Sequence, residues 1–143
     1  MSYFDSAYIA KFYLNEPEGD VVRRLAESLG HVHCSALGRV EVAGVFHRKW
    51  REGAFTEGEF REVSAQFADD CVAGLWTWLS VTDSLIVNTA ESVGALSKRI
   101  TIRAADALHL VCAREHGLLR RVYTNDRHML LAAQAFGVDA MAI

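Results

Sequence analysis

The sequence predicts a three-layer α/β/α fold with a short central parallel sheet, and three observations lead to this expectation. Short apolar segments alternate with longer segments of helical periodicity along the 143 residues. Hydrophobic residues make up 51% of the chain and charged residues 23%, with one proline, which argues against a disordered chain. The length suits one ordinary domain, so we expect residues 1–143 to form a single domain.

The first 34 residues predict two strands and two helices. Ser6 is of a residue type that caps helices, and Pro17 interrupts the chain before the second helix. Apolar residues at helical spacing follow, and Gly30 would end that helix. The expected elements are a strand over residues 1–5, a helix from Ser6 to Leu14, a helix over residues 21–29 and a strand over residues 31–34.

The middle of the chain predicts two helices and a weak strand. Thr56-Glu57-Gly58-Glu59 resembles a capping box, in which Thr56 caps a helix and Glu59 reaches back to its start. Trp76 and Trp78 would point in different directions on a helix, so we expect one of them to be exposed. The expected elements are a helix over residues 40–50 that stops near Gly53, a helix over residues 56–75 and a strand over residues 80–82.

The C-terminal part of the chain predicts three helices and two strands. Gly117 would close the second of these helices. Short apolar strands that alternate with helices are typical of a parallel sheet covered on both faces. The expected elements are helices over residues 84–98 and 104–116, a strand over residues 121–124, a helix over residues 127–136 and a strand over residues 138–143.

Four carboxylates occupy positions that suggest chemistry, because polar residues at the carboxyl ends of parallel strands meet at one edge of the sheet. Asp5 ends the first expected strand and Asp126 follows the strand over residues 121–124, although either could act only as a helix N-cap. Glu41 and Asp106 each interrupt an apolar helix face, where a half-buried charge needs compensation. Salt bridges to Arg39 and Arg103, respectively, would be the simplest compensation.

Four segments surround these carboxylates, and a fifth follows them near the end of the chain. The segments are Tyr3-Phe4-Asp5-Ser6-Ala7, Ser35-Ala36-Leu37-Gly38-Arg39-Val40-Glu41, Arg103-Ala104-Ala105-Asp106-Ala107-Leu108-His109-Leu110, Tyr123-Thr124-Asn125-Asp126 and Ala132-Ala133-Gln134-Ala135-Phe136-Gly137-Val138. They resemble the signature segments of the PIN-domain family, and within it the VapC-type toxins of bacterial and archaeal toxin–antitoxin pairs. The resemblance covers essentially the whole chain, and it implies that Asp5, Glu41, Asp106 and Asp126 are the acidic metal-binding and catalytic residues, with Thr124 as the hydroxyl residue near the last acid.

The resemblance implies an endoribonuclease that depends on Mg²⁺ or Mn²⁺ and acts as a toxin. The expected partners are an RNA substrate, a second copy of the chain in a homodimer, and a protein antitoxin whose C-terminal segment lies across the acidic groove. Hydrolysis of a phosphodiester needs an activated water, neutralisation of charge on the phosphoryl group and support for the leaving 3′ oxygen. A hard divalent cation bound by carboxylates supplies all three.

Three other readings remain open. A PIN-domain RNA-processing nuclease, or an RNA- or protein-binding adaptor on the same fold, would have no toxin role. A phosphohydrolase that uses Asp5 as its nucleophile would need a second aspartate two residues later, where Ala7 stands.

The net charge of −3 means that any binding of RNA must rely on local positive charge or on bound cations. Three basic clusters could guide a phosphate backbone, although the first fits a solvated helix end at least as well. The clusters are Arg48, Lys49 and Arg51; Lys98, Arg99 and Arg103; and Arg120, Arg121 and Arg127.

The histidines and cysteines indicate less about function than the carboxylates do. His109 lies one helical turn from Asp106 and His128 lies close to Asp126, and we expect both on a helix face or at the rim of the pocket. The three cysteines are odd in number, lie far apart and form no zinc pattern, which indicates buried thiols and a reducing compartment. No apolar stretch approaches the length of a membrane span, so we expect a cytoplasmic protein.

Overall fold

The structure is a computed structural model that describes residues 1–117 and 121–143, so Arg120 lies outside the described residues. Its centre is a parallel sheet in the order β3–β2–β1–β4–β5. Each pair of neighbouring strands runs in the same direction. The strands are β1 (Ser2–Phe4), β2 (Val32–Ser35), β3 (Trp76–Leu79), β4 (Arg121–Tyr123) and β5 (Asp139–Met141).

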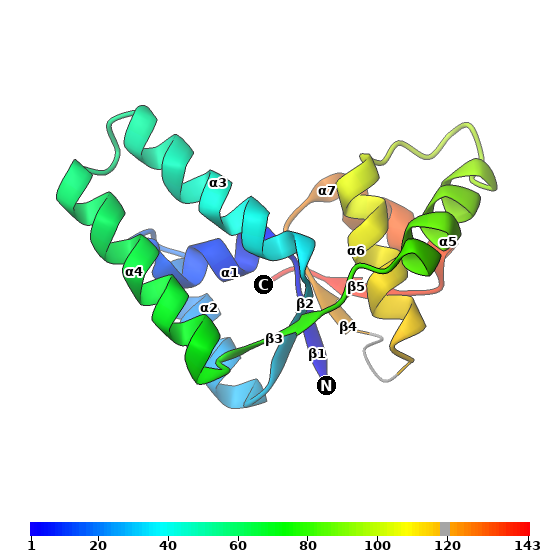
Figure 1. Cartoon of the computed structure of the whole chain (residues 1–143). Coiled ribbons are helices and arrows are strands. Elements are labelled where there is room, and N and C mark those ends of the chain that lie inside the picture. Colours follow the sequence, from blue (N-terminus) through cyan, green and yellow to red (C-terminus); the bar gives the residue numbers. More distant parts are fainter. Residues whose placement is uncertain (118–120) are drawn as a thin grey trace.

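Helices cover both faces of this sheet. Helices α1 to α4 gather on one side and α5 to α7 on the other, with β1 between them (Figure 1). The three-layer α/β/α fold predicted from the sequence is therefore confirmed. The helices are α1 (Ser6–Tyr13), α2 (Gly19–Leu29), α3 (Leu37–Arg51), α4 (Glu57–Ala73), α5 (Asp83–Gly94), α6 (Ala104–Glu115), α7 (Arg127–Ala132) and the 3₁₀ helix η1 (Ala133–Phe136).

The core forms around the central strand β1, because both of its faces are covered. Tyr3 and Phe4 are fully buried, and the Phe4 ring meets Tyr8 of α1 and Tyr123 of β4 edge to face, at centroid distances of 5.4 and 5.6 Å. Edge-to-face contacts of this kind add to the free energy gained by burial. Helix α6 is buried along most of its length, which explains the near-continuous apolar run from Ala107 to Ala113.

The prediction of a strand at residues 80–82 is wrong. Strand β3 comes earlier, at Trp76–Leu79, and pairs in parallel with β2. Helix α4 ends at Ala73 because Gly74 adopts the left-handed conformation, with φ of 80°. Thr82 caps α5 instead, where its hydroxyl oxygen accepts the backbone N–H of Leu85 at 3.1 Å.

The expectation that Trp76 or Trp78 is exposed is also wrong, because residues two apart on a strand share a face. Trp76 is 2% exposed, and its indole N–H donates to the Tyr13 hydroxyl at 2.7 Å. Trp78 is half-buried against Phe67 and below the guanidinium of Arg39. Neither ring is available as an exposed anchor for a partner.

Helix ends show smaller differences from the expectation. Asp5, and not Ser6, is the N-cap of α1, since Ser6 is already helical. Helix α5 ends at Gly94, short of residue 98, and the last helix changes to 3₁₀ geometry after Ala132. The capping box of α4 is confirmed, with both reciprocal hydrogen bonds between Thr56 and Glu59 present.

The three cysteines are free thiols, and Cys34 and Cys112 are buried as expected, whereas Cys71 is only half-buried. None of the helices within residues 1–117 and 121–143 combines the length and hydropathy needed to cross a bilayer.

Gly38 and Gly44 on α3 allow a matched test of how tightly this helix packs on β2. A Cβ atom at Gly38 would lie 2.5 Å from the Cys34 sulfur, whereas a Cβ at Gly44 would meet nothing within 4 Å. We expect Gly38→Ala to lower the free energy of unfolding by about 1–3 kcal/mol through overpacking. Gly44→Ala should raise it by about 0.5–1 kcal/mol, because alanine loses less entropy in a helix. Urea unfolding measures both, and equal stability of the two variants would contradict the predicted packing.

Candidate functional site

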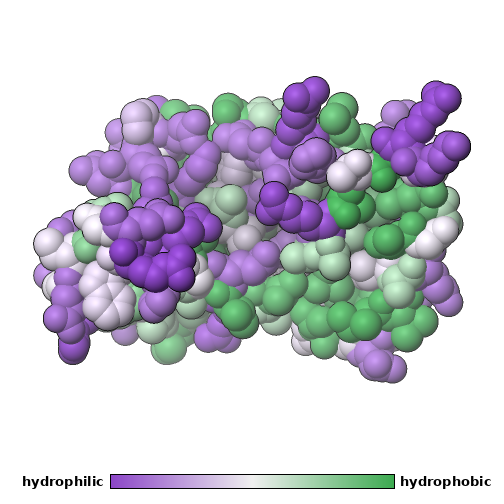
Figure 2. All heavy atoms as spheres, turned by 90° about the horizontal axis from the view of Figure 1, so that it is seen from above, coloured by the Kyte–Doolittle hydropathy of each residue, from purple (hydrophilic) through white to green (hydrophobic). Residues whose placement is uncertain are grey.

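The four predicted carboxylates line one pocket at the carboxyl edge of the sheet. The pocket has a volume of about 580 Å³, and Asp5, Glu41, Asp106 and Asp126 all contribute to its lining. They come from the end of β1, from α3, from α6 and from the turn after β4. Seen from above, hydrophilic side chains gather over the middle of this face, whereas hydrophobic ones dominate the end where α5 lies (Figure 2).

Asp5 is both a helix cap and part of the pocket. One carboxylate oxygen accepts the backbone N–H of Tyr8 at 2.8 Å, and the other accepts the Thr124 hydroxyl at 2.5 Å. The side chain is only 4% exposed. Burial raises the pKa of Asp5, and these two hydrogen bonds oppose that shift by stabilising the carboxylate. Asp5 therefore acts as the helix N-cap and also contributes to the pocket, as both interpretations of its position predicted.

Thr124 acts behind the pocket. It is fully buried and is not among the lining residues. Its hydroxyl donates to Asp5 and accepts the backbone N–H of Asp126 at 3.0 Å, so it links the first acid to the turn that carries the last. Thr124 is thus placed to position Asp5.

Asp106 and Asp126 are like charges that line the same pocket. Asp126 caps α7 by accepting the backbone N–H of Met129 at 2.9 Å, and it also lines the pocket. Asp106 lies half-buried in the first turn of α6. Burial raises the pKa of Asp106, and the negative charge of Asp126 raises it further.

Glu41 pairs with a histidine in place of an arginine. Its Oε1 lies 2.6 Å from Nε2 of His109, and within the described residues it forms no salt bridge with Arg39. His109 is 1% exposed and lines the pocket from α6, so of the two expected places, a helix face or the pocket rim, the structure gives the helix face. The spacing from Asp106 was visible in the sequence, but only the packing of α6 opposite α3 brings His109 to Glu41. His128 is exposed and lines a neighbouring hollow, which agrees with its expected place on a helix face or at the pocket rim.

Arginines line the same pocket. Arg48 and Arg51 of α3 and Arg103, the N-cap residue of α6, belong to it. The first basic cluster is therefore more than a solvated helix end, although Lys49 pairs with Glu16 at 2.6 Å. Arg121 begins β4, at the opposite edge of the sheet, where it pairs with Asp139 at 3.6 Å.

A second basic hollow opens beside α7. It has a volume of about 550 Å³, and its cationic lining residues are Arg99 and Arg127. Because Arg127 directly follows Asp126, this hollow adjoins the turn that carries the last acid. All three predicted clusters thus contribute at least one arginine to the acidic pocket or to the hollow beside it.

The donor atoms fit a hard divalent cation. The acids offer carboxylate oxygens, which Mg²⁺ and Mn²⁺ prefer, and no cysteine is among the lining residues. Among the described residues, no three His, Cys, Asp or Glu side chains stand close enough together to enclose one ion. Mg²⁺ needs no such cage, because it usually keeps several waters and binds through one or two carboxylates and substrate phosphates. The pocket therefore suits a hydrated cation better than zinc, which takes a closed set of ligands.

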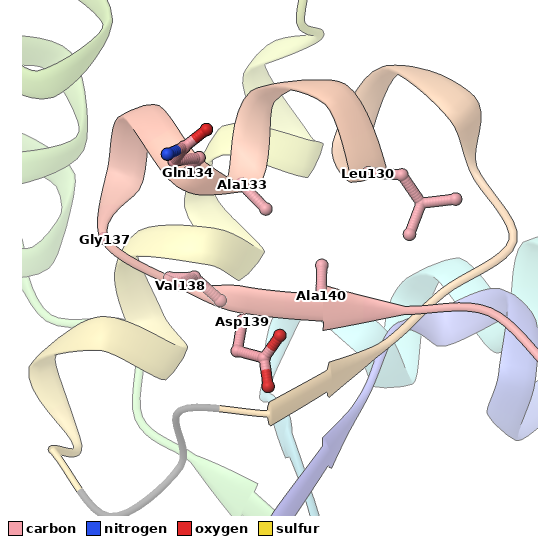
Figure 3. A pocket seen from close by; sticks show the side chains of 7 residues that line it. All are labelled: Leu130, Ala133, Gln134, Gly137, Val138, Asp139 and Ala140. Carbon is pink, nitrogen blue, oxygen red and sulfur yellow. The ribbon is translucent and has the colours of Figure 1, made fainter.

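Another hollow, between α7, η1 and β5, offers little chemistry (Figure 3). Leu130 and Ala133 point from the helical segment toward Ala140 of β5. Its one carboxylate, Asp139, is the partner of Arg121. The candidate site is therefore the acidic pocket.

Comparisons with known proteins agree with the fold. A family model described as PIN domain matches residues 2–135. The chain is similar to a solved structure of FitAcB from Neisseria gonorrhoeae, with a TM-score of 0.73 and 20% identity over 99% of this chain and 96% of that chain. It is also similar to VapC20 from Mycobacterium tuberculosis, described as a toxin that cleaves the sarcin–ricin loop. That match has a TM-score of 0.72 and 16% identity over 92% of this chain and 95% of that chain. No curated protein sequence matches the chain.

The raised pKa of Asp106 predicts how stability depends on pH without divalent cations. The folded protein keeps the Asp106 proton to a higher pH than the unfolded chain does, so this group lowers the free energy of unfolding as pH rises from about 4 through the folded pKa. Asp106→Asn removes this effect, and we expect the variant to gain stability relative to the original protein as pH rises. Urea unfolding in EDTA between pH 4 and pH 8 measures the difference.

Asp69→Asn, at an exposed position on α4, is the matched control and should follow the original protein across the same range. A stability difference for Asp106→Asn that stays constant with pH would contradict the predicted shift.

Proposed function

The chain belongs to the PIN domain family, and from this we propose that it is a metal-dependent endoribonuclease that hydrolyses RNA phosphodiester bonds. We propose further that it is the toxin of a type II toxin–antitoxin pair. The observation that supports the nuclease proposal most directly is the pocket that Asp5, Glu41, Asp106 and Asp126 share. Four carboxylates from segments far apart in the sequence need a common reason to meet, and a divalent cation supplies one.

The chain's own residues prepare the pocket for that cation. Bound Mg²⁺ or Mn²⁺ would neutralise charge on the phosphoryl group and activate the attacking water. Asp5 is fixed by Thr124 and by the start of α1. Asp106 and Asp126 repel each other, so they favour a cation between them.

Arginines would hold the substrate. Arg48, Arg51 and Arg103 line the acidic pocket, and Arg99 and Arg127 line the hollow beside it. A strand of RNA that crosses the carboxylates would therefore meet positive charge at the site of hydrolysis and next to it. One bound divalent cation would also change the formal net charge of −3 to about −1, which weakens the repulsion of RNA.

The partner proposals rest on exposed apolar surface. Ile86 and Val93 on α5 are 48% and 40% exposed and line a largely apolar groove of about 790 Å³ beside α6. Apolar surface of this kind is typical of protein interfaces. We propose that a second copy of the chain and a protein antitoxin are the partners of this chain, with the C-terminal segment of the antitoxin across the acidic pocket.

The RNA-processing nuclease remains the second candidate, because it would use the same pocket on RNA without a toxin role. The adaptor reading is weaker, since an adaptor has no need of four carboxylates in one pocket. The phosphohydrolase reading lacks its second aspartate, because Ala7 lies in the pocket lining at that position.

Purified protein incubated with total RNA and Mn²⁺ or Mg²⁺ tests the nuclease proposal. We expect cleavage products, and we expect excess EDTA to abolish cleavage. Asp5→Asn and Asp106→Asn should retain the circular dichroism of the folded protein and lose activity by roughly 10²–10³-fold, the scale on which one stabilising group is lost from a site. Asp69→Asn should remain active, and full activity in EDTA would exclude the metal-dependent mechanism.

RNA binding tests the role of the arginines separately from cleavage. In the Asp106→Asn background, Arg48→Gln and Arg51→Gln should weaken binding of a labelled single-stranded RNA. Each should also reduce the slope of log K against log salt concentration by about 0.7, the value for one lost phosphate contact. Fluorescence anisotropy between about 50 and 200 mM salt measures the slope.

Arg24→Gln, at an exposed position on α2, should leave affinity and slope unchanged. If Arg48→Gln and Arg51→Gln behave like this control, RNA does not cross the pocket beside α3.

A further inference from the structure

A buried chain of hydrogen bonds ends on Glu41. The backbone N–H of Ser35 donates to the Tyr3 hydroxyl at 2.9 Å, and that hydroxyl lies 2.5 Å from Nδ1 of His109. Nε2 of His109 then lies 2.6 Å from Oε1 of Glu41. Ser35, Tyr3 and His109 are at most 1% exposed, whereas the Glu41 side chain is 28% exposed. This series of hydrogen bonds therefore runs from the sheet to the pocket.

The direction in which each hydrogen bond is donated follows from the backbone N–H of Ser35 at the inner end of this series of hydrogen bonds. The Tyr3 oxygen already accepts the Ser35 N–H, and burial raises the pKa of Tyr3 well above its ordinary value, so the phenol keeps its proton. At 2.5 Å, Nδ1 of His109 is the strongest acceptor for this proton, since the Cys34 and Cys112 thiols that also lie near the hydroxyl are weak acceptors. His109 then carries its own proton on Nε2 and donates it to Glu41.

A neutral donor has a particular value for a carboxylate that binds a cation. An arginine or lysine at Oε1 would orient Glu41 but would also neutralise much of its charge. A neutral imidazole orients the carboxylate and leaves its negative charge available. Groups that hold metal ligands in this way typically change metal affinity by about 10–100-fold when they are removed.

We propose that Tyr3 and His109 are positioning residues that hold the Glu41 carboxylate for a divalent cation, with His109 as a neutral Nε2–H donor. This inference rests on the proposed metal site and adds two residues to it that do not touch the substrate. It also gives Tyr3 a role beyond the core, because a phenylalanine at that position would fill the same space.

The first experiment reads the tautomer of His109 directly. Long-range ¹H–¹⁵N spectra at pH 8, where an ordinary imidazole is neutral, distinguish a protonated Nε2 from a protonated Nδ1. We expect His109 to show the Nε2–H form without metal, and Tyr3→Phe to introduce the other tautomer. The Nδ1–H form or a charged imidazole in the original protein would overturn the proposal.

The second experiment measures Mg²⁺ and Mn²⁺ affinity by calorimetry on catalytically silent samples without RNA. His109→Leu should weaken binding about 10–100-fold, and Tyr3→Phe should weaken it in the same direction. His109→Gln, whose amide can donate from a position close to Nε2, should recover most of the affinity. In a Glu41→Gln background, His109→Leu should have little further effect, because its influence passes through Glu41.

Val111→Ala is the control for lost packing, since Val111 is fully buried on the same helix and takes no part in the pocket. It should bind the cations as the original protein does. If His109→Leu fails to fold, Tyr3→Phe and His109→Gln carry the comparison.

The outcomes separate this proposal from the proposed function. If metal binding follows the expected pattern but no RNA is cleaved, the result supports the positioning role and contradicts the nuclease proposal. Cleavage of RNA with unchanged metal affinity in His109→Leu and Tyr3→Phe overturns the positioning role alone. A protein that binds neither cation overturns both.

Discussion

The buried carboxylate of Asp5 is the constraint on which the rest of the site depends. A charge at the end of the central strand is costly to bury, and the fold compensates it with the start of α1 and with the Thr124 hydroxyl. These two hydrogen bonds join β1, α1 and the turn after β4 at one point. The other three acids are placed around that point by α3, α6 and α7, so the geometry of the pocket follows from how each helix leaves the sheet.

Electrostatic balance explains why the pocket mixes acids with arginines. Burial disfavours the ionised form of Asp106, and the negative charge of Asp126 adds to this effect, so the pKa of Asp106 is raised. Positive side chains at the rim reduce the repulsion without entering ion pairs with the acids among the described residues. The site is stable enough to fold and still favours added positive charge.

Much of this arrangement was predictable from the sequence, and the exceptions have physical causes. The alternation of strands and helices could be predicted because local spacing determines it, and the four acids could be identified because their segments resemble, in chain order, those of the PIN-domain family. The position of β3 could not, because Trp-Thr-Trp-Leu is a short apolar run whose periodicity does not separate helix from strand. The contact between Glu41 and His109 joins residues 68 positions apart, and only the packed layers create it.

The order of the strands has a consequence for when the pocket exists. Strand β4 is the neighbour of β1 in the sheet, yet it is made late in the chain, after β2, β3 and six helices of the described part. During synthesis, Asp5 is therefore made long before its hydrogen-bond donor Thr124, and Asp106 is made before Asp126. A nascent chain that ends before residue 124 lacks both Thr124 and Asp126, so it has no complete acidic pocket.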